Sequence, residues 1–511
     1  MRRPCQDPDR PARPVAPAGT STAVHTGGAP PVALPGGFRV ALDPGARFVG
    51  DDGTVLVGGS PIRLLRLTPS GRALLDRLAA GEPVPTSAAA QRLTRRLLDA
   101  GLAHPRPPAP ASPPHVAVVI PVRNDAGGLA ATLATLGSGP AVVVVVDDGS
   151  LEPGLVAGVC SPHGATLVRR AVPGGPGAAR NCGWRATAGE LVAFVDANCE
   201  PDPGWLDRVL RHFADPQVAA VAPRIAAVAD AAAPGWLAAY EAVSSPLDVG
   251  RREASVRPRS SVAYVPTAAL VVRRSALEAV GGFDEALSVG EDVDFVWRLV
   301  AGGWTVRYEP RATVRHPTRP TGTAWLAQRY RYGTSAAALA RRHGSAVAPA
   351  VVSPWTAAAW GLLAAGQPAL GAAVAGYSIT TLARRLSVPG TAAIAATGHL
   401  QGGLALTRAA RRAWPPAAVL LAVASRRSRA GVAAAVVVPP LLDWAGHRPR
   451  LDPIRFVALR LADDLAYAAG VWAGCWRERS IRALWPDLRG ARGVGLSQTD
   501  DPVAGPIGAG A

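Results

Sequence analysis

Three runs of β-branched and other apolar residues in the middle of the chain constrain its fold most. They are HVAVVIPV at 115–122, AVVVVV at 141–146 and ELVAFVD at 190–196. Strands that are apolar along their whole length are typical of a parallel sheet covered on both faces. The segment DAGGLAATLATLG at 125–137 has helical spacing, and ATLVRR at 165–170 supplies a further strand. The sequence therefore predicts an α/β fold with an open parallel sheet, whose ligands bind beyond the carboxyl ends of the strands.

Polar residues stand where these strands end. The first run continues into PVRND, which contains Pro121 and Asn124, and the second is followed by Asp147, Asp148 and a Gly turn. Carboxylates at this edge of a sheet can accept hydrogen bonds from a nucleobase or a ribose. We therefore expect Asp147 and Asp148 to lie at a ligand site.

A Gly-rich turn, GGPGAARNCGW at 174–184, opens a helix that carries Gly177, Arg180 and Asn181. Such a turn can bring backbone N–H groups and a guanidinium to a phosphate. An ordinary turn has the same appearance. The run that ends in Asp196 is followed by Asn198, and oxygen ligands two residues apart on an extended chain can share one divalent cation with a diphosphate.

Three carboxylates crowd into SVGEDVDFVWRL at 288–299, namely Glu291, Asp292 and Asp294. Mutual repulsion raises the basicity of one carboxylate in such a group, which suits a general base. Acids are also enriched at the start of a helix, where they oppose the helix dipole. Both interpretations stay open, with Asp294 as the residue that serves the helix end.

The order of these motifs, from PVRND to GGFDEALSVGEDVDFVWRL, resembles that of family 2 glycosyltransferases over about residues 116–335. The three asparagines of the chain, Asn124, Asn181 and Asn198, all fall in the motifs. The resemblance implies a GT-A fold, Rossmann-like, and a nucleotide-sugar donor. The residues at the positions of the donor site are Pro121, Asn124, Asp147, Asp148, Gly177, Arg180, Asn181 and Asp196.

The same resemblance implies the catalytic and acceptor residues. Asp292 would deprotonate the acceptor hydroxyl, with Glu291 beside it. QRYRY at 328–332 is similar to the Gln-x-x-Arg-Trp signature of members that extend β-linked polymers, with Tyr332 in place of Trp. The expected acceptor side consists of Glu291, Trp297, Gln328, Arg331 and Tyr332.

A divalent cation, Mg or Mn, is also implied, with Asp196, Asn198 and His316 as its ligands. Family members usually have Asp where this chain has Asn198, and an amide oxygen carries no charge. We therefore expect weaker metal binding, for which Glu200 and Asp202 lie close enough to compensate.

The chain is long enough for several domains, and composition marks their limits. Two helical patterns and Gly-rich strands precede a Pro-rich linker at 104–115, which suits a small winged-helix-like module. The module also resembles small elements that recognise precursor peptides, and a scaffold domain is the alternative. The predicted parts are a lead-in at 1–34, the module at 35–108, the catalytic domain at 109–335, an apolar helical region at 336–490 and a tail at 491–511.

The apolar region has no charged side chain from 344 to 383, and arginines flank this stretch. Charge-free stretches with flanking arginines predict association with a membrane at its inner, cytoplasmic face. The region is rich in Ala and broken by prolines, so a helical extension packed on the enzyme is the alternative. The first twenty residues lack the apolar segment of a signal peptide.

Composition excludes some classes of function. The net charge is +17, but the arginines are scattered without interleaved aromatic residues, so we expect no nucleic acid partner. Five cysteines show no C-x-x-C and no Cys/His ligand spacing, which argues against a zinc site.

The arrangement of module, catalytic domain and apolar region resembles that of glycosyltransferases of the mycofactocin system. These enzymes add glucose to a redox cofactor derived from a ribosomal peptide. The resemblance implies an inverting transfer of glucose from UDP-glucose to a (pre)mycofactocin acceptor, with a short β-linked oligoglucose chain as the product. Two alternatives stay open: a membrane-associated cell-wall or lipid glycosyltransferase, and a non-catalytic regulator that binds sugar nucleotide or peptide.

Overall fold

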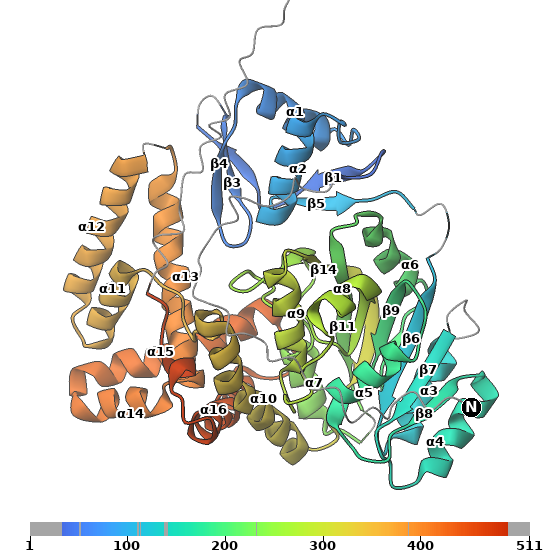
Figure 1. Ribbon diagram of the computed structural model, residues 1–511. Helices are drawn as coiled ribbons and strands as arrows, with labels where there is room; N and C mark the ends of the chain where they lie inside the picture. Colours follow the sequence, from blue (N-terminus) through green and yellow to red (C-terminus); the bar gives the residue numbers. More distant parts are fainter. Residues whose placement is uncertain are drawn as a thin grey trace, which may run out of the picture.

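The computed structural model describes residues 33–50, 53–109, 112, 114–136, 142–230, 232–386 and 388–488. Three parts follow one another along the chain: a small N-terminal module, a central sheet with its helices, and a C-terminal group of helices (Figure 1). The predicted tail and all but the last two residues of the predicted lead-in lie outside the described residues.

The N-terminal module has two helices and two small sheets. Both predicted helices are present: the Thr68 side chain caps α1, and α2 ends at Gly101, which has a left-handed φ of +68°. The winged-helix description is not confirmed, because the strands pair as β1–β5 and β2–β3–β4 around two helices. The predicted linker starts later than expected, since β5 includes its first three residues. The elements are β1 (Arg39–Leu42), β2 (Arg47–Val49), β3 (Val55–Gly58), β4 (Arg63–Arg66), α1 (Pro69–Ala79), α2 (Ala88–Ala100) and β5 (Ala103–Arg106).

The central sheet is mixed rather than wholly parallel. Its strands lie in the order β10-β14-β11-β13-β9-β6-β7-β8, and β12 pairs with β14. The four strands β9, β6, β7 and β8 are parallel as predicted, and β13 runs antiparallel beside β9. The strands are β6 (Val116–Val122), β7 (Val142–Asp147), β8 (Thr166–Arg169), β9 (Leu191–Val195), β10 (Glu200–Pro201), β11 (Val218–Val228), β12 (Ala254–Val256), β13 (Ala269–Arg273) and β14 (Thr305–Pro317).

Helices cover both faces of this sheet, which explains why β6 is apolar along its length. Val118 and Ile120 pack with Leu129 of α3 on one face, and Val119 packs with Ala179 of α5 on the other. The helices of this part are α3 (Ala126–Leu136), α4 (Pro153–Cys160), α5 (Gly175–Arg185), α6 (Trp205–Leu210), α7 (Gly235–Ser244), α8 (Arg274–Val280) and α9 (Glu291–Ala301).

The C-terminal part is helical, as predicted, but its start differs. The predicted boundary at 335/336 falls inside α10 (Gly322–His343), which continues from the catalytic part into the helical part. The charge-free stretch from 344 to 383 divides into two helices at Gly366, which has a φ of +77°. The other helices are α11 (Pro354–Ala364), α12 (Pro368–Leu386), α13 (Thr391–Arg412), α14 (Pro415–Ala424), α15 (Arg426–His447) and α16 (Pro453–Arg477).

Candidate active site

Asp147 is the last residue of β7 and Asp148 follows it, and the carboxylates of both accept hydrogen bonds from within the protein. Asp147 is fully buried; the Ser150 amide donates to its Oδ1 at 2.8 Å and Arg169 to its Oδ2 at 3.1 Å. Burial alone would raise the pKa of Asp147, but hydrogen bonds from Ser150 and Arg169 lower it. Asp148 accepts hydrogen bonds from the amides of the Gly turn at 174–175, at 3.0 and 2.7 Å. Asp148 thus fixes the start of α5, and Asp147 ties the end of β7 to the loop that follows it and to β8. The contact of either acid with a base or ribose stays a prediction.

The other predicted donor residues tie neighbouring segments together. Asn124 has a φ of +56°, and its side-chain oxygen accepts a hydrogen bond from the loop after β7 at 2.8 Å. Asn181 binds both the amide and the carbonyl of Phe283, at 2.9 and 2.8 Å. Gly177 lies against Phe283, and Pro121 is half-buried within β6. The structure therefore gathers these residues at the carboxyl edge of the sheet.

Arg180 connects the donor motif to the acid cluster. Its Nη2 donates to Asp196 at 2.7 Å and its Nη1 to Glu291 at 3.0 Å, while its side chain is only 4% exposed. Burial alone would lower the pKa of Arg180, but Asp196 and Glu291 raise it. The guanidinium thus stays charged between two carboxylates from distant parts of the chain.

The three clustered carboxylates occupy three different environments. Glu291 is buried and binds Arg180. Asp294 is buried and binds Arg298 at 2.7 Å and His343 at 2.8 Å; burial would raise its pKa, but His343 and Arg298 lower it. Their two charges are therefore neutralised within the protein.

Asp292 differs from its two neighbours. It is half-buried, and its Oδ1 accepts a hydrogen bond from the next amide, of Val293, at 2.8 Å. Burial, and then the charge of Glu291, raise the pKa of Asp292 to about 7. A carboxylate with a pKa near neutrality that keeps some solvent contact can take a proton from a bound hydroxyl.

The predicted metal ligands come from two parts of the chain: Asp196 and Asn198 lie between β9 and β10, and His316 lies in β14. β10 pairs antiparallel with β14, with Glu200 opposite Arg315, so the segment from Asp196 to Glu200 runs towards His316. The His316 Nδ1 lies 2.7 Å from the carbonyl of the next residue, to which it can donate. Burial lowers the pKa of His316, and the charge of Asp196 partly opposes this. A neutral imidazole held through Nδ1 has its Nε2 lone pair available to a metal.

The expected compensating acids do not join this set. Glu200 and Asp202 both face the guanidinium of Arg315, at 3.6 and 3.1 Å. No group of three His, Cys, Asp or Glu side chains gathers in an arrangement for metal binding within the described parts of the chain. The binding of a divalent cation by Asp196, Asn198 and His316, with further ligands from a diphosphate, therefore stays a prediction.

The predicted acceptor side is only partly assembled. Gln328 and Tyr332 are joined by a hydrogen bond of 3.0 Å, and Tyr332 is half-buried. Burial raises the pKa of Tyr332, and the charge of Asp292 contributes to this rise. Arg331 is exposed, and Trp297 is buried, with its indole N–H donating to the Ala263 carbonyl at 2.7 Å.

Sequence reasoning missed Arg329, the residue next to Gln328. Its guanidinium is buried and binds Glu241 of α7 and Asp463 of α16. The pattern QRYRY places Arg329 and Arg331 on different faces of a helix, but it does not say which face is buried. The acid pair at 463–464, in a helix whose other charged residues are arginines, was the available signal for a buried partner.

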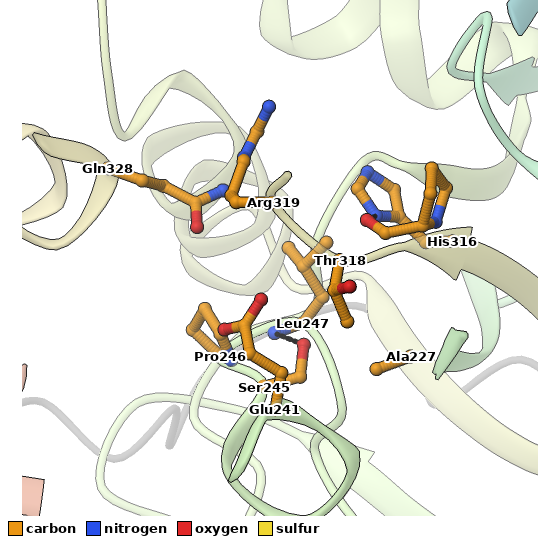
Figure 2. Close-up of a pocket in the computed structure, with 10 residues that line it drawn as sticks. Ala227, Glu241, Ser245, Pro246, Leu247, His316, Thr318, Arg319 and Gln328 are labelled. Carbon is orange, nitrogen blue, oxygen red and sulfur yellow. Dashed lines mark hydrogen bonds between the residues drawn. The ribbon is translucent and has the colours of Figure 1, made fainter. Parts of the chain in front are cut away.

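A very small cavity of about 10 Å³ lies beside His316, lined also by Glu241, Arg319 and Gln328. Figure 2 shows that Glu241, His316 and Gln328 reach it from three different elements. A cavity of this size has room for about one water molecule and not for a substrate.

A larger cavity of about 680 Å³ lies where the N-terminal module meets the catalytic part and α13. Arg47, Arg251 and Arg252 line it, and all three are exposed. The lining carboxylates Asp43 and Glu253 are paired with His104 and Arg106. The remaining charge of this cavity is therefore positive.

Comparison with known sequences decides the family. The family described as "Glycosyl transferase family 2" matches residues 117–281. A protein of Mycobacterium tuberculosis named "Pre-mycofactocin glycosyltransferase" is 43% identical over 474 residues, which cover 89% of this chain and 99% of that protein. The chain belongs to glycosyltransferase family 2.

More distant similarities of this family 2 glycosyltransferase are confined to part of the chain or to the fold. "Glycosyltransferase AglE" of Haloferax volcanii is 28% identical over 229 residues, which cover 43% of this chain and 72% of that protein. A mannosyltransferase of Pyrobaculum calidifontis, solved with GDP-Man and Mn2+, is 21% identical with a TM-score of 0.41, over 72% of this chain and 89% of that one. The family assignment confirms the expected enzyme class and, together with the mixed α/β sheet, the expected GT-A fold.

Proposed function

We propose that this glycosyltransferase transfers glucose from UDP-glucose to a pre-mycofactocin acceptor, and repeats the transfer to build a short β-linked oligoglucose chain. The name of the 43% identical relative supports the acceptor, and the resemblance of QRYRY to the signature of polymer-extending members supports the chain. The observation that carries the proposal is the half-buried Asp292 with a pKa of about 7 beside the ion pairs of Arg180.

In the proposed reaction, Asp292 takes the proton of the acceptor hydroxyl while the oxygen attacks the anomeric carbon. A bond forms between that oxygen and carbon on the face opposite the diphosphate. The bond from the anomeric carbon to the phosphate oxygen breaks, and its electron pair leaves with UDP. Arg180 binds both Asp196, at the proposed donor site, and Glu291, the residue before the base. These two ion pairs fix the position of the base relative to the donor site.

A divalent cation would be held by Asp196, Asn198 and His316 together with the diphosphate. When bound, it would supply positive charge that stabilises the leaving UDP. Because Asn198 contributes no charge, the cation would bind more weakly than at a site with two acids.

The direct test is release of UDP from UDP-glucose, measured with and without a pre-mycofactocin acceptor. We expect acceptor-dependent release together with a glycosylated acceptor detected by mass spectrometry. Transfer to a polyprenyl or lipid acceptor alone would favour the cell-wall or lipid alternative. Binding of UDP-glucose with no turnover on any acceptor would favour the non-catalytic regulator.

We also propose that the N-terminal module contributes to acceptor choice. The positively charged cavity between this module and the catalytic part supports this, since it offers a second surface for a substrate. Arg47 is the lining arginine that belongs to the module, and replacing it by alanine should then raise the acceptor KM and leave the affinity for UDP unchanged. Equal loss of both would indicate a scaffold.

We also propose that the C-terminal helices associate with a membrane, which would suit the alternative of a lipid acceptor. Among the described residues, α15 is the one helix long and apolar enough to cross a membrane, and little of it is buried. Large apolar side chains of α14 are exposed beside it, including Val419, Leu420 and Val423, and three exposed arginines follow at 426, 427 and 429. An apolar surface beside arginines suits attachment to anionic headgroups.

A further inference from the structure

The cavity of about 680 Å³ lies where all three parts of the chain meet. Its lining comes from β2 and β3 of the N-terminal module, from the segment 249–255 that leads into β12, and from α13. Sites for small organic molecules usually have volumes of about 300–1,000 Å³. The cavity therefore has room for a ligand of that size, unlike the water-sized cavity beside His316.

The two carboxylates in the wall of this cavity are neutralised by the protein. Arg106 donates to both oxygens of Glu253, at 2.8 Å to Oε2. Asp43 lies 2.7 Å from Nε2 of His104, and the buried Arg307 lies 3.1 Å from Nδ1 of the same ring. A guanidinium can only donate, so Nδ1 accepts and Nε2 carries the proton that is donated to Asp43. Burial lowers the pKa of His104, which agrees with a neutral ring that links the charge of Asp43 to that of Arg307.

The three lining arginines have no such counter-charge. Arg47, Arg251 and Arg252 are exposed, and within the described residues none of them forms an ion pair or a side-chain hydrogen bond. The acid before the segment, Asp248, is bound to Arg224 at 2.6 Å and so is not available to them. Arginines stay charged at every pH at which proteins fold. The cavity therefore carries an excess of three positive charges.

Contacts between the module and the catalytic part fix the shape of the cavity. The Ser261 amide donates to the Ser60 hydroxyl at 2.5 Å, and both residues belong to the lining. Further from the cavity, Arg95 of the module binds Asp215 in a buried ion pair, at 3.1 Å between Nη2 and Oδ1. The remaining lining includes apolar side chains from all three parts of the chain, namely Val57, Ile62, Val249, Val262 and Ile394. The site thus combines positive charge with an apolar wall before any ligand binds.

One segment of the catalytic part borders both cavities. Residues 245–247 line the small cavity beside His316, and residues 249–255 line the large one (Figure 2). Four residue steps join Leu247 to Arg251, so their Cα atoms are at most about 15 Å apart. The large cavity contains none of the predicted donor, metal or acceptor residues. It is therefore a separate site that adjoins the predicted one.

We propose that this cavity is a second ligand site, which binds a small organic molecule with two or three negative charges through Arg47, Arg251 and Arg252. Guanidinium groups bind carboxylates and phosphates through paired, charge-assisted hydrogen bonds, and the apolar wall would cover the rest of the ligand. A charged group of the acceptor and a free metabolite share this chemistry, and the test separates them. The site stands without the proposed transfer; only its assignment to the acceptor rests on that function.

The test measures binding of citrate and of phenyl phosphate to the full-length protein by calorimetry, in buffer free of divalent cations. The cavity variant Arg251→Gln/Arg252→Gln is compared with Arg208→Gln/Arg211→Gln, which removes two exposed arginines of the catalytic part outside the cavity. We expect at least one probe to bind as a single molecule per chain. Its Kd should rise roughly tenfold or more in the cavity variant, because hydrogen bonds to charged groups are lost, and stay within about twofold in the control.

Arg47→Gln tests the same site from the module and should also weaken binding of the probe. Failure of both probes to bind the wild-type protein, or equal binding by the wild-type protein and the cavity variants, would overturn the site. A pre-mycofactocin acceptor added without UDP-glucose then identifies the source of the anion: displacement of the probe assigns it to the acceptor, and retention assigns it to a free metabolite. These measurements involve no turnover. Lack of transfer by the wild-type protein would therefore defeat the proposed function and leave the cavity site in place.

Discussion

Glu291 and Asp292 are adjacent in the chain, but only Glu291 forms an ion pair with Arg180, at 3.0 Å. Asp292 has no ion pair of its own within the described residues, and its pKa is raised to about 7. The two neighbouring acids therefore have different roles: Glu291 binds the guanidinium of Arg180, and the charge of Glu291 helps to raise the pKa of Asp292.

Replacing the base should remove transfer and spare donor binding. Asp292→Asn keeps the size of the side chain but cannot accept a proton, and general base catalysis is worth about 10²- to 10⁴-fold in rate. We expect kcat for glucosyl transfer to fall by that factor while the affinity for UDP stays near that of wild type. Near-wild-type transfer by this variant would overturn the assignment of the base.

The pH dependence should report the same group. Asp292 must be ionised to act, so the transfer rate should rise with pH and level off above about 7, the raised pKa of this carboxyl. Glu291→Gln removes the neighbouring negative charge and should move this rise to lower pH. The measurement is the pH profile of kcat in both proteins, and an unmoved profile would exclude electrostatic coupling between Glu291 and Asp292.

The donor edge should respond to loss of the acid at the end of β9. Asp196→Asn can still accept a hydrogen bond from Arg180 but loses the charge that would bind a cation. With Mn²⁺ present, we expect the affinity for UDP-glucose to fall roughly tenfold or more, because a hard cation depends on charged oxygen ligands. The exposed Asp207→Asn serves as control. If Mn²⁺ changes the affinity for UDP-glucose of neither the wild-type protein nor the Asp196→Asn variant, the cation does not bind beside Asp196.

Asp294 should matter for stability and not for chemistry. It was expected to serve only the helix end, where a single charge is worth under about 1 kcal/mol. The structure instead buries it between Arg298 and His343. Removing one member of a buried ion pair costs about 3–5 kcal/mol, so Asp294→Asn should lower Tm clearly. Transfer measured below the unfolding transition should stay within about threefold, since the residue does not contact the reacting atoms.

The membrane proposal can be tested with the full chain and lipid vesicles. We expect sedimentation with phosphatidylglycerol vesicles and much less with phosphatidylcholine, because each arginine near an anionic surface contributes about 1 kcal/mol. Replacing the arginines at 426, 427 and 429 with glutamine should weaken this binding, whereas Arg211→Gln in the catalytic part should not. Full-length protein that stays monodisperse without detergent and ignores both vesicle types would contradict the proposal.

Much of the catalytic part was predictable because strand signals and strand-end acids are local. The runs at 115–122, 141–146 and 190–196 form β6, β7 and β9, and Arg180 and Asp196 meet at their carboxyl edge as expected. The antiparallel β13 escaped prediction because a buried apolar strand has the same appearance whichever way it runs.

Other features depend on contacts that have no local signal. Trp297 was expected at the acceptor side, yet its indole is buried in the core, since an aromatic residue on a helix gives the same pattern in both places. The pairing of Arg329 with Asp463 joins residues 134 positions apart. Hydrophobic periodicity shows that a helix has a buried face, but not which partner covers it.

The backbones of α10 and α16 touch at Gly333 and Gly470: a Cβ on Gly333 would lie 2.1 Å from the carbonyl oxygen of Tyr467, and one on Gly470 would lie 2.0 Å from that of Tyr330. This contact limits where the gene can be truncated or recombined. A fragment ending at residue 335, where composition suggests a border, would stop in the middle of α10 and discard the helix that its backbone touches. The segment from α10 to α16 therefore forms one structural unit with the catalytic sheet and is not an exchangeable domain. An exchange of the C-terminal helices between relatives would have to transfer both α10 and α16, so that Gly333 and Gly470 stay matched.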